Sequence, residues 1–366
     1  MKQKTKIPFL TLSLLFIVLT FQIGIGQAVG NQLIVDAPST AEIKKEPALS
    51  DPTIVRSRNV IVNQDILHTD DIIELDLFGD VSFSIKKQRI QNRGPGRFTW
   101  FGSVKGQKDS QVILTVENGG MAGNITVDNQ MYQIRDSGSG IHSVREIDLN
   151  GFGDCFAPTP VDVKHFETEP IKDSKMDDGS IIDIMVVYTA AAAASAGILS
   201  EIQLAIDETN QSYINSGVTP RLNLVHSAQV TYTESGDIQT DRNRLQSKTD
   251  GYMDNVHALR DTHKADLVSL WVANGGGYCG IAYIMTTVST AFEDYGFQVT
   301  ARNCATGYFS FGHEFGHIQS ARHDWYVDPT NNSPYTYNHG YVDPADACRT
   351  IMAYGNDCAG CTRIQY

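Results

Sequence analysis

A chain of 366 residues is long enough for two domains. Its formal net charge of −13 argues against a nucleic-acid-binding protein and is ordinary for a soluble exported one. The six cysteines would form disulfides outside the cytosol. Cys358 and Cys361 form a CxxC motif without a partner motif, so we interpret this motif as structural and not as a second metal site.

Residues 1–26 have the pattern of a secretory signal peptide. Three lysines precede an apolar run from Ile7 to about Ile25, and glycines near its end suit cleavage near Gln27. An uncleaved signal anchor is the alternative, because the run approaches the ~20 residues that cross a bilayer. The first cysteine is Cys155, which excludes a lipoprotein anchor, and no later segment is apolar enough to span a membrane. We therefore expect a secreted, extracellular protein with no membrane contact after cleavage.

Residues 27–156 have the sequence pattern of a β-rich domain. Apolar and polar residues alternate over 81–85 and again over 112–116, which is typical of half-buried strands. Turn residues at 118–120 and 128–129 separate the later strands. These patterns predict a meander of strands with no catalytic constellation in it.

Residues 157–179 are rich in proline and charge, and we interpret them as an exposed linker. Lys172 and Lys175 make this linker a reasonable processing site. The β-rich domain ahead of it is then best explained as a propeptide.

The composition changes again at Ile181, where residues 180–366 begin a second domain. The sequence predicts strands near 181–188, 222–230 and 267–272, a helix running through the alanine tract to about Ser216, and another helix near 241–263. In the first helix, isoleucines at 198, 202 and 206 share one face. Strands that alternate with helices predict an α/β layout.

The segment His313–Asp324 reads HEFGHIQSARHD. On a helix, His313 and His317 lie one turn apart on one face, while Phe311, Phe315 and Ile318 cluster on roughly the opposite face. Glu314 projects beside the histidine pair, where a general base for a zinc-bound water belongs. Thr306 is the expected N-cap of this helix.

A third histidine, His323, follows six residues after His317, so the chain must turn back after about residue 319. The pattern resembles that of the metzincin metallopeptidases, HExxHxxGxxH followed by a Met-turn. Here Ser320 stands at the position of the family glycine, which normally adopts a left-handed conformation. Residues 349–354 resemble the Met-turn, with Met352 as the apolar floor beneath the metal.

Neighbouring residues narrow the resemblance to the bacterial reprolysin-like group that includes peptidyl-Asp metalloendopeptidases. They are Asp324 and the segments 337–341 and 361–364. The resemblance implies an α/β catalytic domain with a mixed five-stranded sheet and an active-site helix, preceded by the β-rich propeptide domain. It also implies that residues 278–284 form the edge strand on which an extended substrate docks.

The resemblance further implies a zinc-dependent endopeptidase that acts on proteins or peptides. One Zn²⁺, held by His313, His317 and His323, would lower the pKa of a water to about 7, and Glu314 would accept its proton. Tyr354 would approach the metal or the developing oxyanion, or else would only pack beside Met352. Acidic residues at 328, 343 and 346 fit no calcium loop, and the sequence predicts no oligomeric state.

Two arginines flank the Met-turn, Arg349 and Arg363. In relatives the wall of the pocket beyond the scissile bond is built here, so a cation would favour an acidic residue after the cut. Ordinary surface arginines are the alternative. Two other kinds of protein also remain open at this point: an adhesin-like binding protein with a degenerate protease domain, and a zinc hydrolase acting on a non-peptide amide.

Cys155 lies about two dozen residues ahead of the catalytic domain. Its thiolate is a strong zinc ligand and would keep the enzyme latent, although a disulfide is the alternative because six cysteines pair evenly. Latency through Cys155 leaves five cysteines, at 279, 304, 348, 358 and 361, of which Cys279–Cys304 is our preferred pair. Only twelve residues follow Tyr354, whereas metzincins usually continue into a C-terminal helix, so we expect the catalytic domain to lack its last segment.

Overall fold

The computed structural model describes residues 31–38, 51–161, 179–330, 333–355, 358 and 361–366. The expected signal peptide (1–26) and the processing residues Lys172 and Lys175 lie outside these residues. Among the described residues, no helix combines the length and the apolar character that a bilayer crossing requires.

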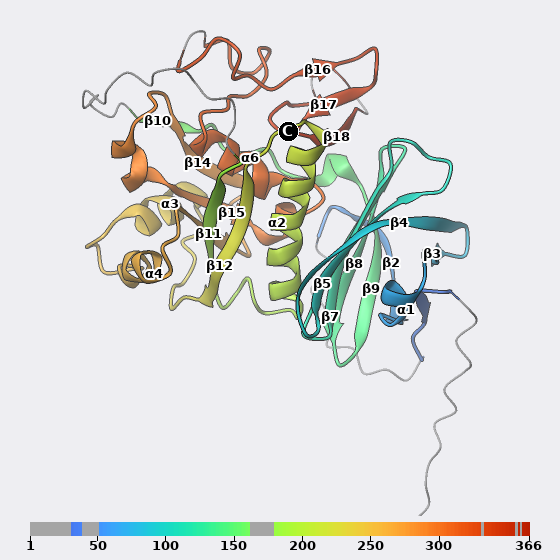
Figure 1. The fold of residues 1–366 in the computed structure, drawn as a ribbon. Coiled ribbons are helices and arrows are strands. Elements are labelled where there is room, and N and C mark those ends of the chain that lie inside the picture. The colour runs from blue at the N-terminus through green and yellow to red at the C-terminus, as the bar shows by residue number, and fades with distance from the viewer. Residues whose placement is uncertain (1–30, 39–50, 162–178, 331–332, 356–357, 359–360) are drawn as a thin grey trace, which may run out of the picture. The chain divides into compact units, whose positions relative to one another are not determined.

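The first part of the chain forms a nine-stranded antiparallel sheet, which we call the N-terminal sheet (Figure 1). Its strands are β1 (Ile34–Asp36), β2 (Ile54–Val62), β3 (Ile72–Phe78), β4 (Val81–Gly94), β5 (Arg97–Val104), β6 (Gln111–Glu117), β7 (Gly120–Val127), β8 (Gln130–Gly138) and β9 (Ile141–Ile147), with a short helix α1 (Ile66–Thr69). From β3 to β9 each strand pairs with the next, so the predicted meander is confirmed. The turn at Asp128 and Asn129 has positive φ at both residues (47° and 64°), as a tight two-residue hairpin requires.

The N-terminal sheet curls back toward itself. Backbone hydrogen bonds join residues 31–33 to Glu74 of β3, although β1 and β3 stand at opposite ends of the strand order. The enclosed core includes Leu75, Trp100 and Leu114, all fully buried. The curled sheet therefore encloses an apolar core of its own.

The second part of the chain is built on a six-stranded mixed sheet with the order β10-β14-β15-β13-β11-β12. The strands are β10 (Thr159–Val161), β11 (Ile181–Tyr188), β12 (Arg221–Gln229), β13 (Leu267–Val272), β14 (Gly280–Met285) and β15 (Phe297–Ala301). Five of them belong to the predicted catalytic domain. The prediction of five strands missed the sixth, β10, because residues 159–161 were assigned to the exposed linker.

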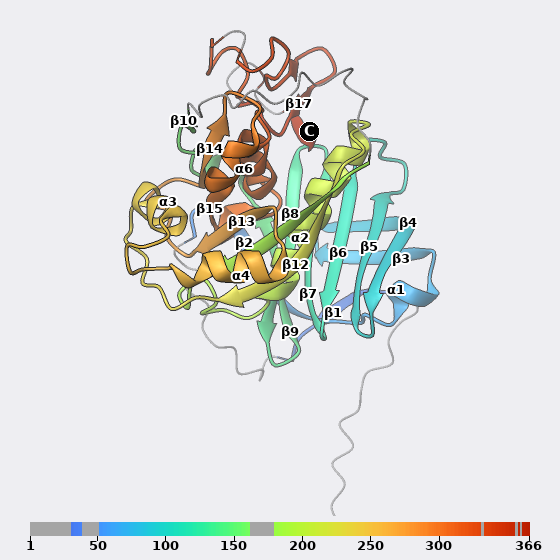
Figure 2. The same cartoon turned by 60° about the vertical axis from the view of Figure 1, so that its left-hand side comes forward.

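Helices cover both faces of this sheet (Figure 2). On β11 the side chains of Ile184 and Val186 pack toward α2 (Ile198–Asn215) and α6 (Ser310–Ile318), whereas Met185 and Val187 pack toward α3 (Ile238–Gln246) and α4 (Asn255–His263). This alternation follows from the two-residue period of a strand. Remaining short elements are α5 (Arg302–Ala305), a 3₁₀ turn at Thr290–Tyr295, and a three-stranded sheet of β16 (Val342–Asp343), β17 (Cys348–Thr350) and β18 (Thr362–Gln365).

Two helix predictions were wrong in extent. The alanine tract at 190–194 forms a turn, and α2 begins only at Ile198, after Gly197 in a left-handed conformation (φ 81°). The predicted helix over 241–263 is two helices, α3 and α4, because the Ser- and Gly-containing stretch 247–254 breaks it. The shared face of the isoleucines is confirmed, since Ile202 and Ile206 are buried in the core.

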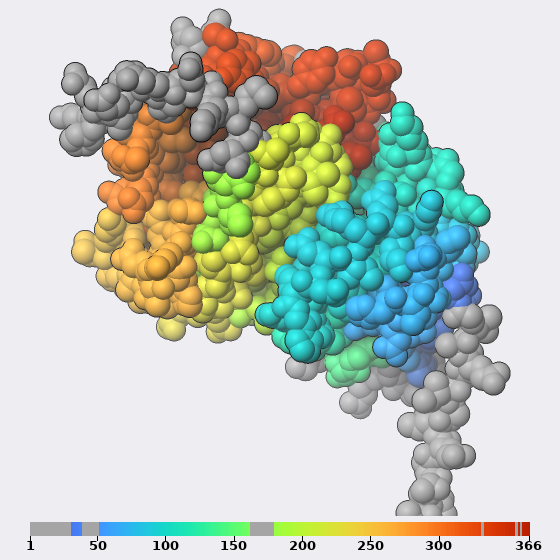
Figure 3. Space-filling view, in the orientation of Figure 1, coloured from blue at the N-terminus to red at the C-terminus, as the bar shows by residue number. Residues whose placement is uncertain are grey.

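Helix α2 also contacts the N-terminal sheet, against β6 and β7. Figure 3 shows the yellow-green surface of the helix directly beside the cyan surface of the sheet. Leu204 of α2 enters a small apolar cluster with Phe101, Ile113 and Ala122 of the sheet. Next to this cluster, a buried carboxylate of α2, Asp207, accepts hydrogen bonds from two threonines of the sheet, at 2.5 Å from Thr99 and 3.3 Å from Thr115.

A neighbouring carboxylate, Glu208, also lies at this contact and is 2% exposed. It accepts hydrogen bonds from Asn124 of the sheet and from the backbone N–H of Gly307. The contact between α2 and the sheet therefore consists of a small apolar centre and a buried polar network.

Candidate metal centre

The metal-binding motif lies on α6, as predicted. Phe311 and Phe315 are fully buried on the sheet side of this helix, which fixes the opposite side toward the site. The predicted cap Thr306 is wrong, because α6 begins at Ser310 after Phe309, whose left-handed conformation (φ 65°) starts the helix. Thr306 instead accepts a hydrogen bond from Arg135 of the N-terminal sheet.

The chain turns back directly after α6 ends at Ile318. Ser320 has a φ of 77°, the left-handed conformation expected at the position of the family glycine. The N–H of Ala321 then donates to the carbonyl of Gly316 (2.8 Å), which closes the helix end. Because the turn is this tight, His323 returns to the helix face that carries His313 and His317.

The three imidazoles converge on one point through the same ring atom. Their Nε2 atoms lie 3.0–3.1 Å from one another. The Nδ1 atoms of His313 and His317 lie at 2.7 and 2.8 Å from the carbonyl oxygens of Ile351 and Ala321. In the tautomer with the proton on Nδ1, these carbonyls accept it and the Nε2 lone pairs are free to bind a metal; Nη2 of Arg363 also lies 3.2 Å from Nδ1 of His313. Zinc ligated tetrahedrally by imidazoles separates the nitrogens by roughly 3.3 Å, so these residues fit a zinc ion.

The electrostatics of the cluster favour neutral rings. Burial, together with the two neighbouring imidazoles, holds the pKa of His313 well below its usual range, and His317 behaves in the same way. Burial also lowers the pKa of His323 to about 4. Neutral imidazole is the form that binds a metal.

Glu314 projects beside the histidines and is fully buried. Neither of its carboxylate oxygens makes a hydrogen bond of good geometry with another described residue, although the Cys155 thiol is close enough to favour the ionised form. Burial raises its pKa to about 8. The carboxyl lies directly against β14, since a β-carbon on Gly280 would fall 2.5 Å from its Oε1. A buried carboxyl without a hydrogen bond of good geometry is costly unless it serves a ligand or a reaction.

Residues of the predicted Met-turn lie beneath and beside the histidines. Met352 is buried, and its sulfur lies 2.4 Å from where a β-carbon on Gly316 would be, so the methionine packs against α6. The ring of Tyr354 is 4.7 Å from that of His323, and its hydroxyl donates to the carbonyl oxygen of Cys155 (3.1 Å). Burial raises the pKa of Tyr354, so its hydroxyl keeps its proton.

Cys155 reaches the same site from the segment that follows the N-terminal sheet. We call residues 152–161 the connecting segment. The Cys155 thiol is buried and forms a second cluster with His313 and Glu314, in which the ligand atoms lie within 4.8 Å of one another. Burial and the nearby Glu314 raise the pKa of this thiol. The only groups of three or more potential ligands among the described residues are this cluster and the histidine triad.

The connecting segment then continues along β14. Backbone hydrogen bonds of 2.9 and 2.8 Å link Cys279 to Asp154 and Phe156 to Gly280, and β10 pairs with β14 in parallel. The predicted edge strand over 278–284 therefore has a neighbour, and β10 forms the edge of the sheet instead.

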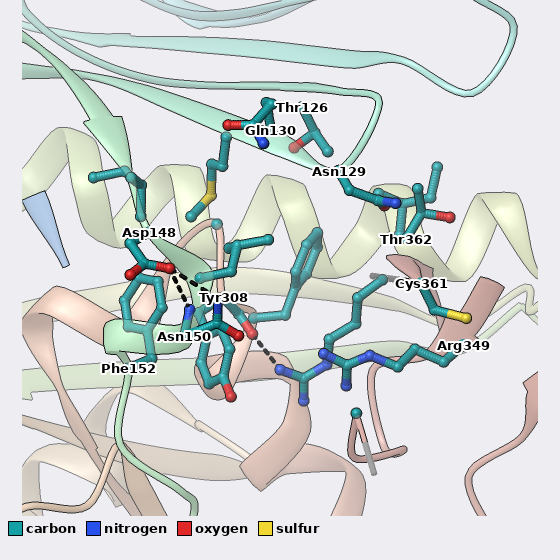
Figure 4. A pocket seen from close by; sticks show the side chains of 18 of the residues that line it. Thr126, Asn129, Gln130, Asp148, Asn150, Phe152, Tyr308, Arg349, Cys361 and Thr362 are labelled. Carbon is teal, nitrogen blue, oxygen red and sulfur yellow. Dashed lines mark hydrogen bonds between the residues drawn. The ribbon is translucent and has the colours of Figure 1, made fainter. Parts of the chain in front are cut away.

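A cavity of about 730 Å³ opens next to the site (Figure 4). Tyr308, Arg349 and Arg363 line it together with Phe152 and Asp154 of the connecting segment. Arg363 donates to the carbonyls of Tyr308 (2.6 Å) and Ile351, and Arg349 donates to that of Ala353. Burial and the neighbouring Arg363 lower the pKa of Arg349 to about 10. Within the described residues neither guanidinium forms an ion pair with a carboxylate, although Glu146, Asp148 and Asp154 line the same cavity.

The cysteines pair partly as expected. Cys279–Cys304 forms a disulfide, which confirms the preferred pair, and Cys358–Cys361 forms a second. Cys155 and Cys348 are free thiols, so the alternative of a disulfide for Cys155 is wrong in this structure.

Comparisons with known proteins agree with this geometry. A family model described as "Metallo-peptidase family M12" (Reprolysin_5) matches residues 178–365. A peptidyl-Asp metalloendopeptidase of Stenotrophomonas maltophilia (strain R551-3) is 36% identical over 323 residues, which are 80% of this chain and 74% of that protein. Another, from Xanthomonas campestris pv. campestris, is 30% identical over 351 residues, 90% of this chain and 82% of that protein. The chain belongs to metallopeptidase family M12.

Membership of family M12 makes the protein a zinc metalloendopeptidase with protein or peptide substrates, and it confirms the predicted reprolysin-like family. A solved structure titled "Crystal Structure of metalloproteinase-II from Bacteroides fragilis" aligns at 10% identity with a TM-score of 0.46, over 82% of this chain and 90% of that one.

Sequence reasoning missed three features of this M12 site. Asp324 accepts from the backbone N–H of Tyr354 (2.8 Å) and so ties the turn at His323 to the Met-turn. His339 contacts the carbonyl of His323 through its Nδ1 (2.7 Å). Arg242 of α3 lies under β14. Only Asp324 had a sequence signal, its position directly after the third histidine.

Proposed function

We propose that this chain is the exported, latent precursor of a zinc endopeptidase in which Glu314 is the general base and His313, His317 and His323 hold the metal. One observation carries the catalytic part of the proposal. Three neutral imidazoles converge through Nε2 beside a buried carboxyl that makes no hydrogen bond of good geometry with another described residue. Such a set is built for activating water and not for packing.

Each residue of the site has its own role in the reaction. Zinc, when bound, supplies a Lewis acid that polarises a peptide carbonyl and acidifies water. Glu314, with its raised pKa, accepts the proton of the attacking water, holds it, and passes it to the leaving nitrogen. Tyr354, which already donates to a carbonyl oxygen, would donate to the substrate carbonyl as negative charge develops there. The Ile351 and Ala321 carbonyls keep His313 and His317 in the required tautomer.

We assign a preference for an acidic residue after the cut to Arg349 and Arg363. Both line the cavity beside the metal site, and neither forms an ion pair with a carboxylate of the described chain. A substrate carboxylate would pair with these guanidinium groups. The relatives named peptidyl-Asp metalloendopeptidase support this assignment.

Latency follows from the connecting segment. Its Cys155 lies beside the metal site, next to His313 and Glu314, and its β10 pairs with β14, while the N-terminal sheet anchors it through α2. The N-terminal sheet would then be the propeptide, removed after cleavage in the linker over 162–178. Export by a signal peptide over 1–26 agrees with the disulfides, which form in oxidising compartments.

The general-base assignment is tested by Glu314→Gln. The variant should bind zinc with wild-type stoichiometry but hydrolyse casein several orders of magnitude more slowly after processing. Metal content, measured by atomic absorption, and activity with and without a chelator separate loss of metal from loss of the base. Equal casein hydrolysis by the variant and the wild type would refute the mechanism.

The acid preference is tested with a peptide library varied at the residue after the cut. We expect Arg363→Gln and Arg349→Gln to reduce kcat/KM for an Asp peptide by roughly 10- to 100-fold, with smaller effects on its Asn counterpart. A wild-type enzyme that accepts only hydrophobic residues at this position would contradict the assignment.

A further inference from the structure

A buried arginine of α3, Arg242, is not used by the mechanism. It is 2% exposed, and no carboxylate of the described chain pairs with it. Its guanidinium lies 3.9 Å from the ring centre of Tyr283 on β14, and its Nη1 donates to the carbonyl of Ala282 (3.2 Å). Its Nε has no acceptor at all. Packing beneath β14 does not require a cation, and burying one without an ion-pair partner is costly, even though the charge of Glu314 acts on it from a distance.

Two further contacts show what kind of group the guanidinium binds. Its Nη2 donates to the side-chain oxygen of Asn243, the next residue of α3, at 3.0 Å. Its Nη1 donates to the side-chain hydroxyl of Thr159, at 2.8 Å, and Thr159 belongs to the connecting segment. Thr159 stands opposite Tyr283 in the parallel pairing of β10 with β14. The cation is thus reached by a side chain from the strand that covers β14, and that strand is not part of the catalytic domain.

The position of Arg242 relative to the metal site follows from the course of the connecting segment. Phe152 and Asp154, before Cys155, line the cavity of Arg349 and Arg363. Thr159, four residues after Cys155, reaches Arg242. The two cationic sites therefore lie on opposite sides of the metal site. An extended chain advances ~3.3 Å per residue, so Arg242 is about three to four residue positions away from the metal.

We propose that Arg242 is a second specificity-determining residue, which binds an oxygen-bearing side chain of the substrate about three to four residues before the cut bond. The inference rests on the proposed function. If Arg349 and Arg363 bind the substrate residue after the cut bond, Arg242, on the opposite side of the metal site, faces the residues before it. When the connecting segment leaves, Nη1 loses the Thr159 oxygen and keeps only Ala282. A substrate hydroxyl replaces the lost bond, and a carboxylate also neutralises the charge.

The chemistry predicts an order of preference. Asp at this substrate position should be best, Thr intermediate and Val worst. Val is the same size as Thr but leaves a buried, charged donor unpaired. The gain should appear mainly in KM, because the contact lies away from the reacting atoms and is the same in the ground and transition states.

The experiment uses the full chain, expressed and then activated by limited proteolysis within residues 162–178. Peptides with Asp after the cut carry Thr, Val or Asp at the third or the fourth position before it. For the wild type we expect kcat/KM to be about 10- to 100-fold higher with Thr than with Val at one of these positions, and at least as high with Asp. Arg242→Met should reduce this ratio to about one. Arg242→Lys should keep part of the preference.

A second measurement needs no substitution in the enzyme and therefore does not depend on folding of the variants. A synthetic peptide of residues 152–161 should inhibit the activated wild type, and the same peptide with Thr159→Val should inhibit about 10-fold less well. Equal cleavage of the Thr, Val and Asp peptides, or equal inhibition by the two connecting-segment peptides, would overturn the Arg242 subsite alone. Failure of the wild type to cleave any of the peptides would overturn the proposed function and the subsite with it.

Discussion

At the scale of single residues, Ser320 is the clearest case of a residue at the site whose conformation destabilises the folded chain. It holds a φ of 77°, its hydroxyl is buried without a partner, and it lies between the two halves of the metal-binding motif. A left-handed conformation costs a non-glycine residue roughly 1–2 kcal/mol, and an orphaned buried hydroxyl costs about 1–3 kcal/mol. Glycine pays neither cost, although it loses ~0.5–1 kcal/mol through the entropy of the unfolded chain.

Ser320→Gly should therefore raise the free energy of unfolding of the full chain by about 1 kcal/mol, measured by urea denaturation. Ser320→Ala is the matched control, because it removes the orphaned hydroxyl but keeps the backbone strain, and it should stabilise less than glycine does. A glycine variant that is less stable than the wild type would show that the strain argument is wrong.

At the scale of elements, the sequence predicted those features that depend on residues close together in the chain, and it missed those that depend on contacts between distant residues. The strand over 181–188 and the active-site helix were predictable because their patterns are local, and Ser320 was expected in its left-handed turn. The pairing of β10 with β14 was not, since three residues in a proline-rich stretch carry no strand pattern and are held by a partner over 120 positions away. The role of Arg242 was hidden for the same reason, because its contacts lie on β10 and β14.

Helix α2 carries a pH-dependent contact with the N-terminal sheet. Burial raises the pKa of Glu208 to about 7, and the negative charge of Asp207 adds to this rise. The hydrogen bonds from Asn124 and Gly307 and the positive charge of Arg135 favour the ionised form and oppose it. A raised carboxyl pKa contributes stability that is fully present below the unfolded pKa of about 4.3 and is lost as pH rises through about 7. The full loss is on the order of 3–4 kcal/mol, of which about 2–3 kcal/mol falls between pH 5 and pH 8.

Glu208→Gln should remove this part of the pH dependence. Relative to the variant, the wild-type full chain should lose about 2–3 kcal/mol between pH 5 and pH 8, measured by urea denaturation at both values. Any pH-independent cost of the glutamine cancels in that comparison. Asp109→Asn changes an exposed carboxylate that forms no side-chain hydrogen bond or ion pair with another described residue, and it serves as the control, for which we expect no such difference. An equal gap between wild type and Glu208→Gln at both pH values would contradict the prediction.

At the scale of the whole molecule, the connecting segment joins three contacts that differ in kind. Cys155 meets the metal site, β10 extends the sheet on β14, and the N-terminal sheet packs on α2. Because all three belong to one covalent chain, each contact holds the others near their partners. Latency should therefore weaken in steps as contacts are removed, and no single substitution should give full activity.

Cys155→Ser removes only the thiol at the metal site and keeps the side chain nearly the same size. A loss of ~1.4 kcal/mol of docking free energy raises the fraction of open molecules tenfold. The uncut variant should therefore hydrolyse a peptide at least about tenfold faster than the uncut wild type, yet remain well below the processed enzyme, because β10 and the contact on α2 persist. Initial rates of zinc-loaded chains, with their uncut length verified on a gel, give this comparison.

Cys348→Ser changes the other free thiol, which lies on β17 outside the site, and should leave the rate unchanged. Equal rates for uncut Cys155→Ser and wild type would show that β10 and the N-terminal sheet suffice for latency, and that the thiol contributes nothing to it.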